Sequence, residues 1–194
     1  MRIFKAKIYD YLLLMNKKSK KEVLFVLGTR PEAIKLAPLI KEFEKYPDEY
    51  TVEICSTGQH REMLVQVLDF FEIKPKYELD VMQPNQELSA LTAAILRGVS
   101  KIMAQHSFDL VFVQGDTTTS FAAALAAFYA GVKVCHVEAG LRTNNKQSPF
   151  PEELNRQLTT RIADYHFAPT TLARTNLLAD GISDEDILVT GNTV

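Results

Sequence analysis

The sequence predicts an α/β protein built on a doubly wound, Rossmann-like parallel sheet. From residue 22 onward, short apolar runs alternate with longer segments that have helical periodicity. The short runs are apolar throughout, which is typical of parallel strands covered on both faces. Glycine and polar residues follow several of these runs, as expected where a strand turns into a helix. These observations favour a single sheet with helices on both sides.

The first expected strand, 22–28, is rich in β-branched and other apolar residues and ends in glycine. Another short strand is expected within the proline-containing segment 72–85. The remaining strands are expected at 51–57, 110–115, 132–138, 165–169 and 186–190.

The first expected helix has the clearest start. Thr29 is placed as its N-cap, Pro31 lies in the first turn, and Glu32 completes a capping box. Pro47 and Asp48 are expected to end it. The other helices are expected at 60–71, 86–105, 117–129, 151–163 and 170–179.

Composition excludes several classes of protein. The 194 residues carry 22 basic and 24 acidic side chains, and this near balance argues against a nucleic-acid partner. The two cysteines, Cys55 and Cys135, lie inside apolar runs. They exclude a disulfide scaffold and indicate a reducing compartment, so we expect a cytoplasmic protein. No apolar stretch reaches the ~20 residues needed to cross a bilayer, and we expect no membrane partner.

Residues 1–21 are expected to be an N-terminal extension of a domain at 22–194. Their apolar patch, 11–15, is shorter than the ~7–15 residues of a signal-peptide core. A lysine-rich run follows the patch instead of a small-residue cleavage site. A frayed tail or a short extra helix is therefore favoured over a signal peptide.

Polar residues gather where the strands end, and the carboxyl ends of parallel strands form the ligand-binding edge of such sheets. After the first strand, Arg30 and Lys35 lie in the first turns of a helix, where backbone N–H groups and the helix dipole attract anions. They suit a phosphate or diphosphate, although a capped helix with solvated cations is an equal alternative. Neither a G-x-G-x-x-G fingerprint nor a P-loop is present.

Carboxylates occupy the same edge. Asp116 follows the strand at 110–115, where it is either a helix N-cap or a group that faces a ligand. Glu138 ends the strand at 132–138 and is harder to explain as a structural residue. Glu152 and Arg156 lie four apart on one helix, where an ion pair is the default interpretation and a shared ligand the alternative. Together these groups indicate acid–base chemistry beside an anion.

The histidines do not predict a metal site, because none forms a His/Cys pair with ligand spacing. His136 is expected to be a hydrogen-bonded core residue, and His60 is equally well interpreted as a helix-start or a site residue. No G-x-S-x-G motif supports a serine nucleophile.

Six ordered motifs carry a resemblance: GTRPEAIKLAPLI, TGQHREML, VQGDTTTS, HVEAGLRT, PFPEELNR and VTGNTV. In this order they closely resemble the non-hydrolysing UDP-N-acetylglucosamine 2-epimerases, over about 23–194. In the first motif, Pro31 and Glu32 favour this branch over the hydrolysing one. The resemblance implies a glycosyltransferase-B-like fold of two domains with the active site between them, of which this chain is the N-terminal half. For the full-length form it implies a homodimer.

The implied reaction interconverts UDP-N-acetylglucosamine and UDP-N-acetylmannosamine. The C2 proton is removed, UDP leaves from C1, and UDP then re-adds with the proton returned to the other face. This chemistry requires no redox cofactor or metal. The resemblance implies Asp116, Glu138 and Glu152 as catalytic carboxylates, with Arg30, Lys35 and Arg156 as cations on the substrate side.

Two other functions fit the same features. Half of a nucleotide-sugar glycosyltransferase would share the fold, and a non-catalytic nucleotide-sugar binding module fits a single domain. Gln59 and His60 match a segment that binds an activating UDP-N-acetylglucosamine in some relatives. Departures at Glu62 and around Asn85 argue against that regulation here.

Overall fold

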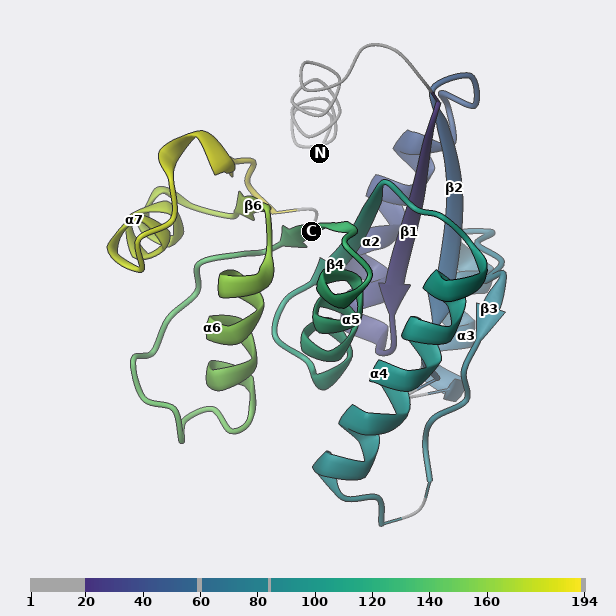
Figure 1. Cartoon of the computed structure of the whole chain (residues 1–194), viewed down its shortest axis with the longest axis horizontal. Helices are drawn as coiled ribbons and strands as arrows, with labels where there is room; N and C mark the ends of the chain where they lie inside the picture. Colours follow the sequence, from purple (N-terminus) through teal and green to yellow (C-terminus); the bar gives the residue numbers. More distant parts are fainter. Residues whose placement is uncertain (1–19, 59–60, 84, 193–194) are drawn as a thin grey trace.

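The computed structural model describes residues 20–58, 61–83 and 85–192. It contains a parallel sheet of seven strands in the order β3-β2-β1-β4-β5-β6-β7 (Figure 1). The strands are β1 Lys21–Leu27, β2 Tyr50–Ser56, β3 Tyr77–Glu78, β4 Leu110–Gln114, β5 Lys133–Val137, β6 Tyr165–Ala168 and β7 Ile187–Val189. Strand order reverses between β1 and β4, as in a doubly wound Rossmann-like sheet. The predicted fold class is confirmed.

The helices lie close to their predicted positions. They are α2 Arg30–Phe43, α3 Arg61–Phe70, α4 Leu88–Gln105, α5 Thr118–Tyr129, α6 Glu152–Ile162 and α7 Thr171–Ala179, and a 3₁₀ turn, η1, spans Asp184–Asp186. The helix α2 ends before the predicted stop at Pro47 and continues through Pro38. No helix among the described residues has the length and apolar character that a membrane crossing requires.

The central strands are covered on both faces, and alternate residues of β1 show how. Val23, Phe25 and Leu27 pack with α2 and α3, whereas Leu24 and Val26 pack with α4 and α5. All five side chains have no exposed surface. This two-sided burial explains why residues 23–27 of the strand are all apolar instead of alternating with polar ones.

An aromatic cluster fills the middle of the sheet on the α2 side. Phe112 of β4 stacks on Phe25 with ring centroids 4.7 Å apart, and Phe43 of α2 meets both rings edge-on. The two cysteines, Cys55 and Cys135, are free and buried, as their apolar surroundings predicted. This core fixes the positions of β1 and β4, whose carboxyl ends are followed by polar residues.

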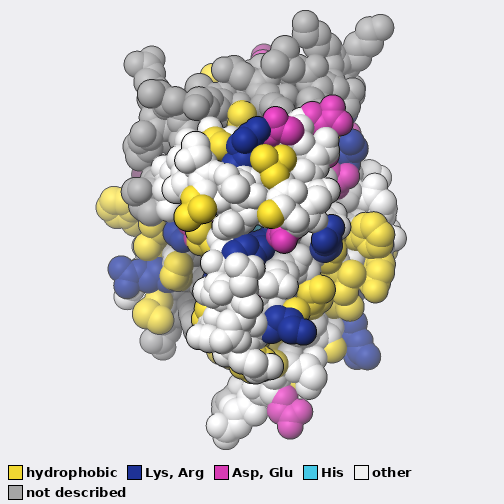
Figure 2. Space-filling view, turned by 90° about the vertical axis from the view of Figure 1, so that its left-hand side faces the viewer, with side chains coloured by type: hydrophobic (Ala, Val, Ile, Leu, Met, Phe, Trp, Pro, Cys, Tyr) yellow, Lys and Arg dark blue, Asp and Glu magenta, His cyan; other side chains and the backbone are white. Residues whose placement is uncertain are grey.

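Figure 2 shows the side of the molecule on which α6 and α7 lie. Basic, acidic and apolar side chains are interspersed over the part of this face that the structure describes.

Helix α7 approaches the loop after β5 closely at Gly140, which has φ of +91°. A Cβ atom there would lie 2.3 Å from the carbonyl oxygen of Ala173, so only glycine fits. This contact fixes where the loop leaves β5.

Candidate functional site

The polar residues converge where strand order reverses, at the carboxyl ends of β1, β4 and β5. A cleft of about 530 Å³ opens at this edge. Its walls come from the starts of α2, α5 and α6 and, on the apolar side, from Met63 of α3 and Leu88 at the start of α4. The lining residues include Thr29, Arg30, Thr117, Thr118, Glu152 and Asn155. In open α/β sheets this is the usual place for a ligand.

The turn between β1 and α2 is held from inside by Glu32. Its buried carboxylate accepts hydrogen bonds from the backbone N–H groups of Gly28 (2.9 Å) and Thr29 (2.7 Å) and from the Thr117 hydroxyl (2.6 Å). The predicted capping box is therefore present. Burial raises the pKa of Glu32, although its hydrogen bonds act in the opposite direction. The carboxylate thus ties α2 to the start of α5.

This arrangement changes the expected anion site. The N–H groups of Gly28 and Thr29 donate to Glu32, so, contrary to the expectation from the sequence, they are not free to bind a phosphate. Arg30 remains exposed and lines the main cleft. It also lines an adjacent hollow of about 380 Å³ together with Lys35. Any anion at this helix start would depend on these two side chains.

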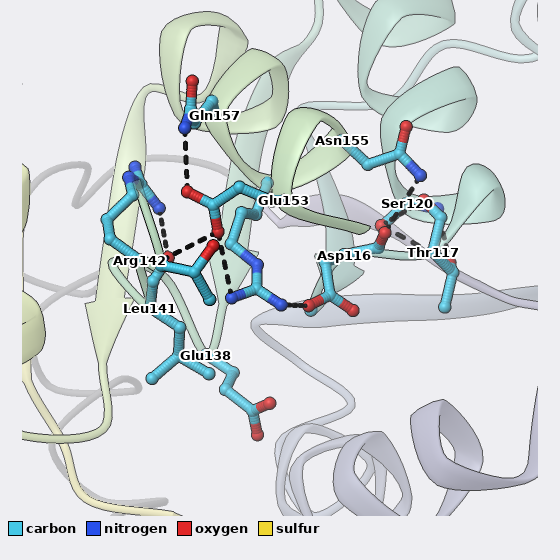
Figure 3. A network of polar contacts seen from close by, with 12 residues as sticks. Asp116, Thr117, Ser120, Glu138, Leu141, Arg142, Glu153, Asn155 and Gln157 are labelled. Atoms are coloured by element: carbon cyan, nitrogen blue, oxygen red, sulfur yellow. Dashed lines mark hydrogen bonds and ion pairs between the residues drawn. The ribbon is translucent and has the colours of Figure 1, made fainter. Parts of the chain in front are cut away.

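Asp116 is held by an arginine from α6. The Arg156 guanidinium donates to the Asp116 carboxylate, and its other terminal nitrogen lies 3.3 Å from Glu153 Oε2. Asn155 adds a bond from its amide to the Asp116 carbonyl oxygen (3.0 Å). Figure 3 shows Asp116 and Glu153 joined through the same guanidinium. The alternative of Asp116 as a helix N-cap is wrong, because Thr117 caps α5.

The expected ion pair between Glu152 and Arg156 does not form. Arg156 instead pairs with Glu153, three residues before it, because Glu153 is on the buried side of α6. Glu152 is half-buried and lines the cleft. Within the described residues it has no ion pair, which leaves its carboxylate available to a ligand.

Glu138 pairs with Lys35 across the edge of the sheet. The Lys35 ammonium lies 2.8 Å from Oε1 and 2.6 Å from Oε2 of Glu138. The carboxylate is directed away from the Asp116–Glu153 contacts in Figure 3. Glu138 also has φ of +65°, a backbone conformation that is costly for a residue with a side chain. Such strain at a strand end is common at functional sites.

His136 of β5 lies in the core of the sheet. His136 is fully buried, and its Nε2 is 2.7 Å from the carbonyl oxygen of Gly115, which precedes Asp116. Burial lowers the pKa of His136 to about 3, so the ring is neutral at pH 7. The prediction of a buried core histidine is confirmed, but Nδ1 has no partner among the described residues. His60 lies outside the described residues.

In the part of the chain that the structure describes, no group of three or more His, Cys, Asp or Glu side chains is placed to hold a metal ion. The geometry instead offers three carboxylates and three cations around one edge of the sheet. Carboxylates beside cations can move protons next to an anionic group. This set of groups suits acid–base chemistry on a phosphorylated ligand.

A family model described as UDP-N-acetylglucosamine 2-epimerase matches residues 41–194. The chain belongs to this family. The UDP-N-acetylglucosamine 2-epimerase of Salmonella borreze is 57% identical over 173 residues, which cover 89% of this chain and 46% of that relative. The chain spans about half the length of the curated relatives it matches.

Solved structures agree with this membership. The crystal structure of UDP-GlcNAc 2-epimerase from Neisseria meningitidis bound to UDP-GlcNAc has 52% identity and a TM-score of 0.86, over 89% of this chain and 46% of that one. The lipopolysaccharide outer core galactosyltransferase WaaB, at 20% identity and a TM-score of 0.64 over 89% of this chain and 46% of its own, shares the fold alone.

In this member of the epimerase family, the six predicted site residues lie around one edge of the sheet, and four of them form two ion pairs. Lys35 contacts Glu138 and Arg156 contacts Asp116, while Arg30 and Glu152 line the cleft. Their roles stay predictions. Sequence reasoning missed Glu153. Its signal was the spacing to Arg156, at i+3, and to Gln157, at i+4.

Proposed function

We propose that this chain forms the N-terminal half of an enzyme that interconverts UDP-N-acetylglucosamine and UDP-N-acetylmannosamine. The observation that carries the proposal is that ion pairs hold Asp116 and Glu138 where β4 and β5 end, while Glu152 and Arg30 line the cleft at the same edge of the sheet. Membership of the family supports it, as does the Neisseria meningitidis relative, whose structure is titled as bound to UDP-GlcNAc. The domain is proposed to span 22–194, with 1–21 as an extension.

The reaction is proposed to run by elimination and re-addition. The C2–H of the sugar is a weak acid, so a carboxylate must be positioned against it. Ion pairs with Arg156 and Lys35 fix Asp116 and Glu138 in place, and Glu152 stands in the cleft wall. These three groups are proposed to take the proton and return it to the opposite face.

UDP is proposed to leave with its diphosphate beside Arg30 and Lys35. A guanidinium can bind two phosphate oxygens at once, and an ammonium adds a mobile charge. Lys35 already contacts Glu138, so it is placed to couple the diphosphate to a catalytic carboxylate. Closure of the site and most of the hold on the nucleotide are assigned to the half of the relatives that this chain does not cover. Homodimer formation and a cytoplasmic location are part of the same proposal.

The test uses a hybrid enzyme, defined as this chain joined at its carboxyl end to the remaining half of the Salmonella borreze relative. Asp116→Asn, Glu138→Gln and Glu152→Gln should each lower its turnover by at least ~100-fold, the scale of a lost general acid or base. Glu42→Gln is the control, since Glu42 pairs with Lys45 three residues later on α2. Epimerised product is measured by proton NMR.

Two outcomes would count against the proposal. Near-normal turnover in a carboxylate variant would remove that residue from the catalytic set. Sugar transfer to an added acceptor, with no epimerised nucleotide-sugar, would instead favour a glycosyltransferase.

A further inference from the structure

A fully buried carboxylate on the first turn of α6 has no part in the proposed proton transfer. Glu153 accepts hydrogen bonds from the backbone N–H groups of Thr143 (3.0 Å) and Asn144 (3.1 Å) and from Gln157 Nε2 (2.8 Å). Its Oε2 also lies 3.3 Å from an Arg156 terminal nitrogen. With no exposed surface, Glu153 cannot touch a substrate in this structure.

These contacts connect two parts of the site. Thr143 and Asn144 belong to the loop that follows β5, and Asn144 has φ of +61°. Arg156 holds Asp116 at the end of β4. Burial alone would raise the pKa of Glu153, but its hydrogen bonds outweigh burial and the pKa is lowered. A buried carboxylate that stays charged can hold both partners.

We propose that Glu153 is a positioning residue, which anchors the loop after β5 and sets the place of Asp116 by holding Arg156. The reaction that it would serve rests on the proposed function, whereas the anchoring does not. Arg156 lies between two carboxylates, and two directed contacts fix the plane of its guanidinium. Removal of one of them leaves the arginine free to rotate and Asp116 less well placed.

The variant Glu153→Gln tests the anchor in a specific way. Oε1 of Glu153 accepts hydrogen bonds from Asn144 and Gln157. Oε2 accepts from Thr143 and pairs with Arg156. Whichever oxygen becomes an NH₂ group, it therefore opposes donors, and at least one of the two backbone amides loses its acceptor. Glutamine cannot substitute for this carboxylate by rotating.

Amide hydrogen exchange on the 194-residue chain gives the first readout. In Glu153→Gln, exchange at Thr143 or Asn144 should accelerate about tenfold or more, the scale of one lost hydrogen bond. Glu42→Gln, which removes a similar i,i+3 pair on α2, should leave both amides unchanged. Should Glu153→Gln not fold, Glu153→Asp takes its place, because the shorter chain cannot reach all partners. Unchanged exchange at both amides would overturn the proposal.

Turnover of the hybrid enzyme gives the second readout. Glu153→Gln should lower kcat by about tenfold or more with KM changed by less than about threefold, since it alters positioning and not binding. In the double variant with Glu153→Gln and Arg156→Ala, the fold loss of kcat should be at least about fivefold smaller than the product of the losses in the two single variants. Fully multiplicative losses would overturn the proposed route through Arg156. An unmodified hybrid that does not epimerise would count against the proposed function instead, and the exchange readout would still decide the anchor.

Discussion

Removal of the Glu32 carboxylate should loosen the turn that carries Arg30. In Glu32→Ala, the backbone N–H groups of Gly28 and Thr29 lose their shared acceptor in a buried place. The Thr117 hydroxyl loses its acceptor too, but it can turn toward Ser120 Oγ, 3.4 Å away. Two buried amide donors are therefore left without partners.

Each such donor costs about 1–3 kcal/mol, so the two together cost about 2–6 kcal/mol. Relief of the desolvation that raises the Glu32 pKa offsets part of this, which gives a net loss of roughly 3 kcal/mol. For a domain of this size that corresponds to a fall in Tm of about 6–12 °C. Glu32→Gln should lose no more than about 1 kcal/mol, because its one oxygen can accept from both amides while its NH₂ group donates to Thr117.

Thermal unfolding of the chain at pH 7, followed by far-ultraviolet circular dichroism, measures both variants. Glu44→Ala serves as the control, since its exposed pair with Lys41 should contribute less than about 1 kcal/mol. A loss below about 1 kcal/mol in Glu32→Ala would refute the reasoning, and so would equal losses for the alanine and glutamine variants. Either result would mean that the carboxylate does not hold the turn.

Two further predictions concern charge. Arg30→Ala in the hybrid enzyme should weaken UDP binding by about 2 kcal/mol or more, as measured by calorimetry, since a charge-assisted contact is lost. Unchanged affinity would make Arg30 a solvated helix-start residue. The lowered pKa of Glu153 should stabilise the fold above the ordinary glutamate pKa and lose that stabilisation as pH falls through the lowered value. Urea unfolding of wild type and Glu153→Gln from pH 3 to pH 6 should show their stability difference shrinking toward acid, and a constant difference would contradict this.

The order of strands and helices could be predicted because the signals are local. Two-sided burial makes the buried part of β1, residues 23–27, entirely apolar, and the capping box joins Thr29 and Glu32 across only three residues. The gathering of polar residues at one edge also followed, since parallel strands all end on the same side. The sequence signals that predict each strand and each helix start lie within one strand or one helical turn.

The pairing of the charged groups could not be predicted. Lys35 and Glu138 are 103 residues apart, and Arg156 and Asp116 are 40 apart, so sequence spacing says nothing of their contact. The neighbours Glu152 and Glu153 have the same chemistry, and only the packing of α6 decides which one is buried. That choice assigns one carboxylate to the cleft and the other to the support of the loop.

Deuterium incorporation at C2 tests the central claim most directly. UDP-N-acetylglucosamine is incubated in heavy water with the hybrid enzyme, with its Asp116→Asn variant and with the 194-residue chain alone, and followed by proton NMR. We expect the hybrid to form UDP-N-acetylmannosamine carrying solvent deuterium at C2, and the variant to be slowed at least ~100-fold. The chain alone should show no exchange above the protein-free rate, because an open half-site forfeits the ~7–11 kcal/mol that closed positioning supplies. Product that retains its original C2 hydrogen, or exchange catalysed by the chain alone, would contradict the account.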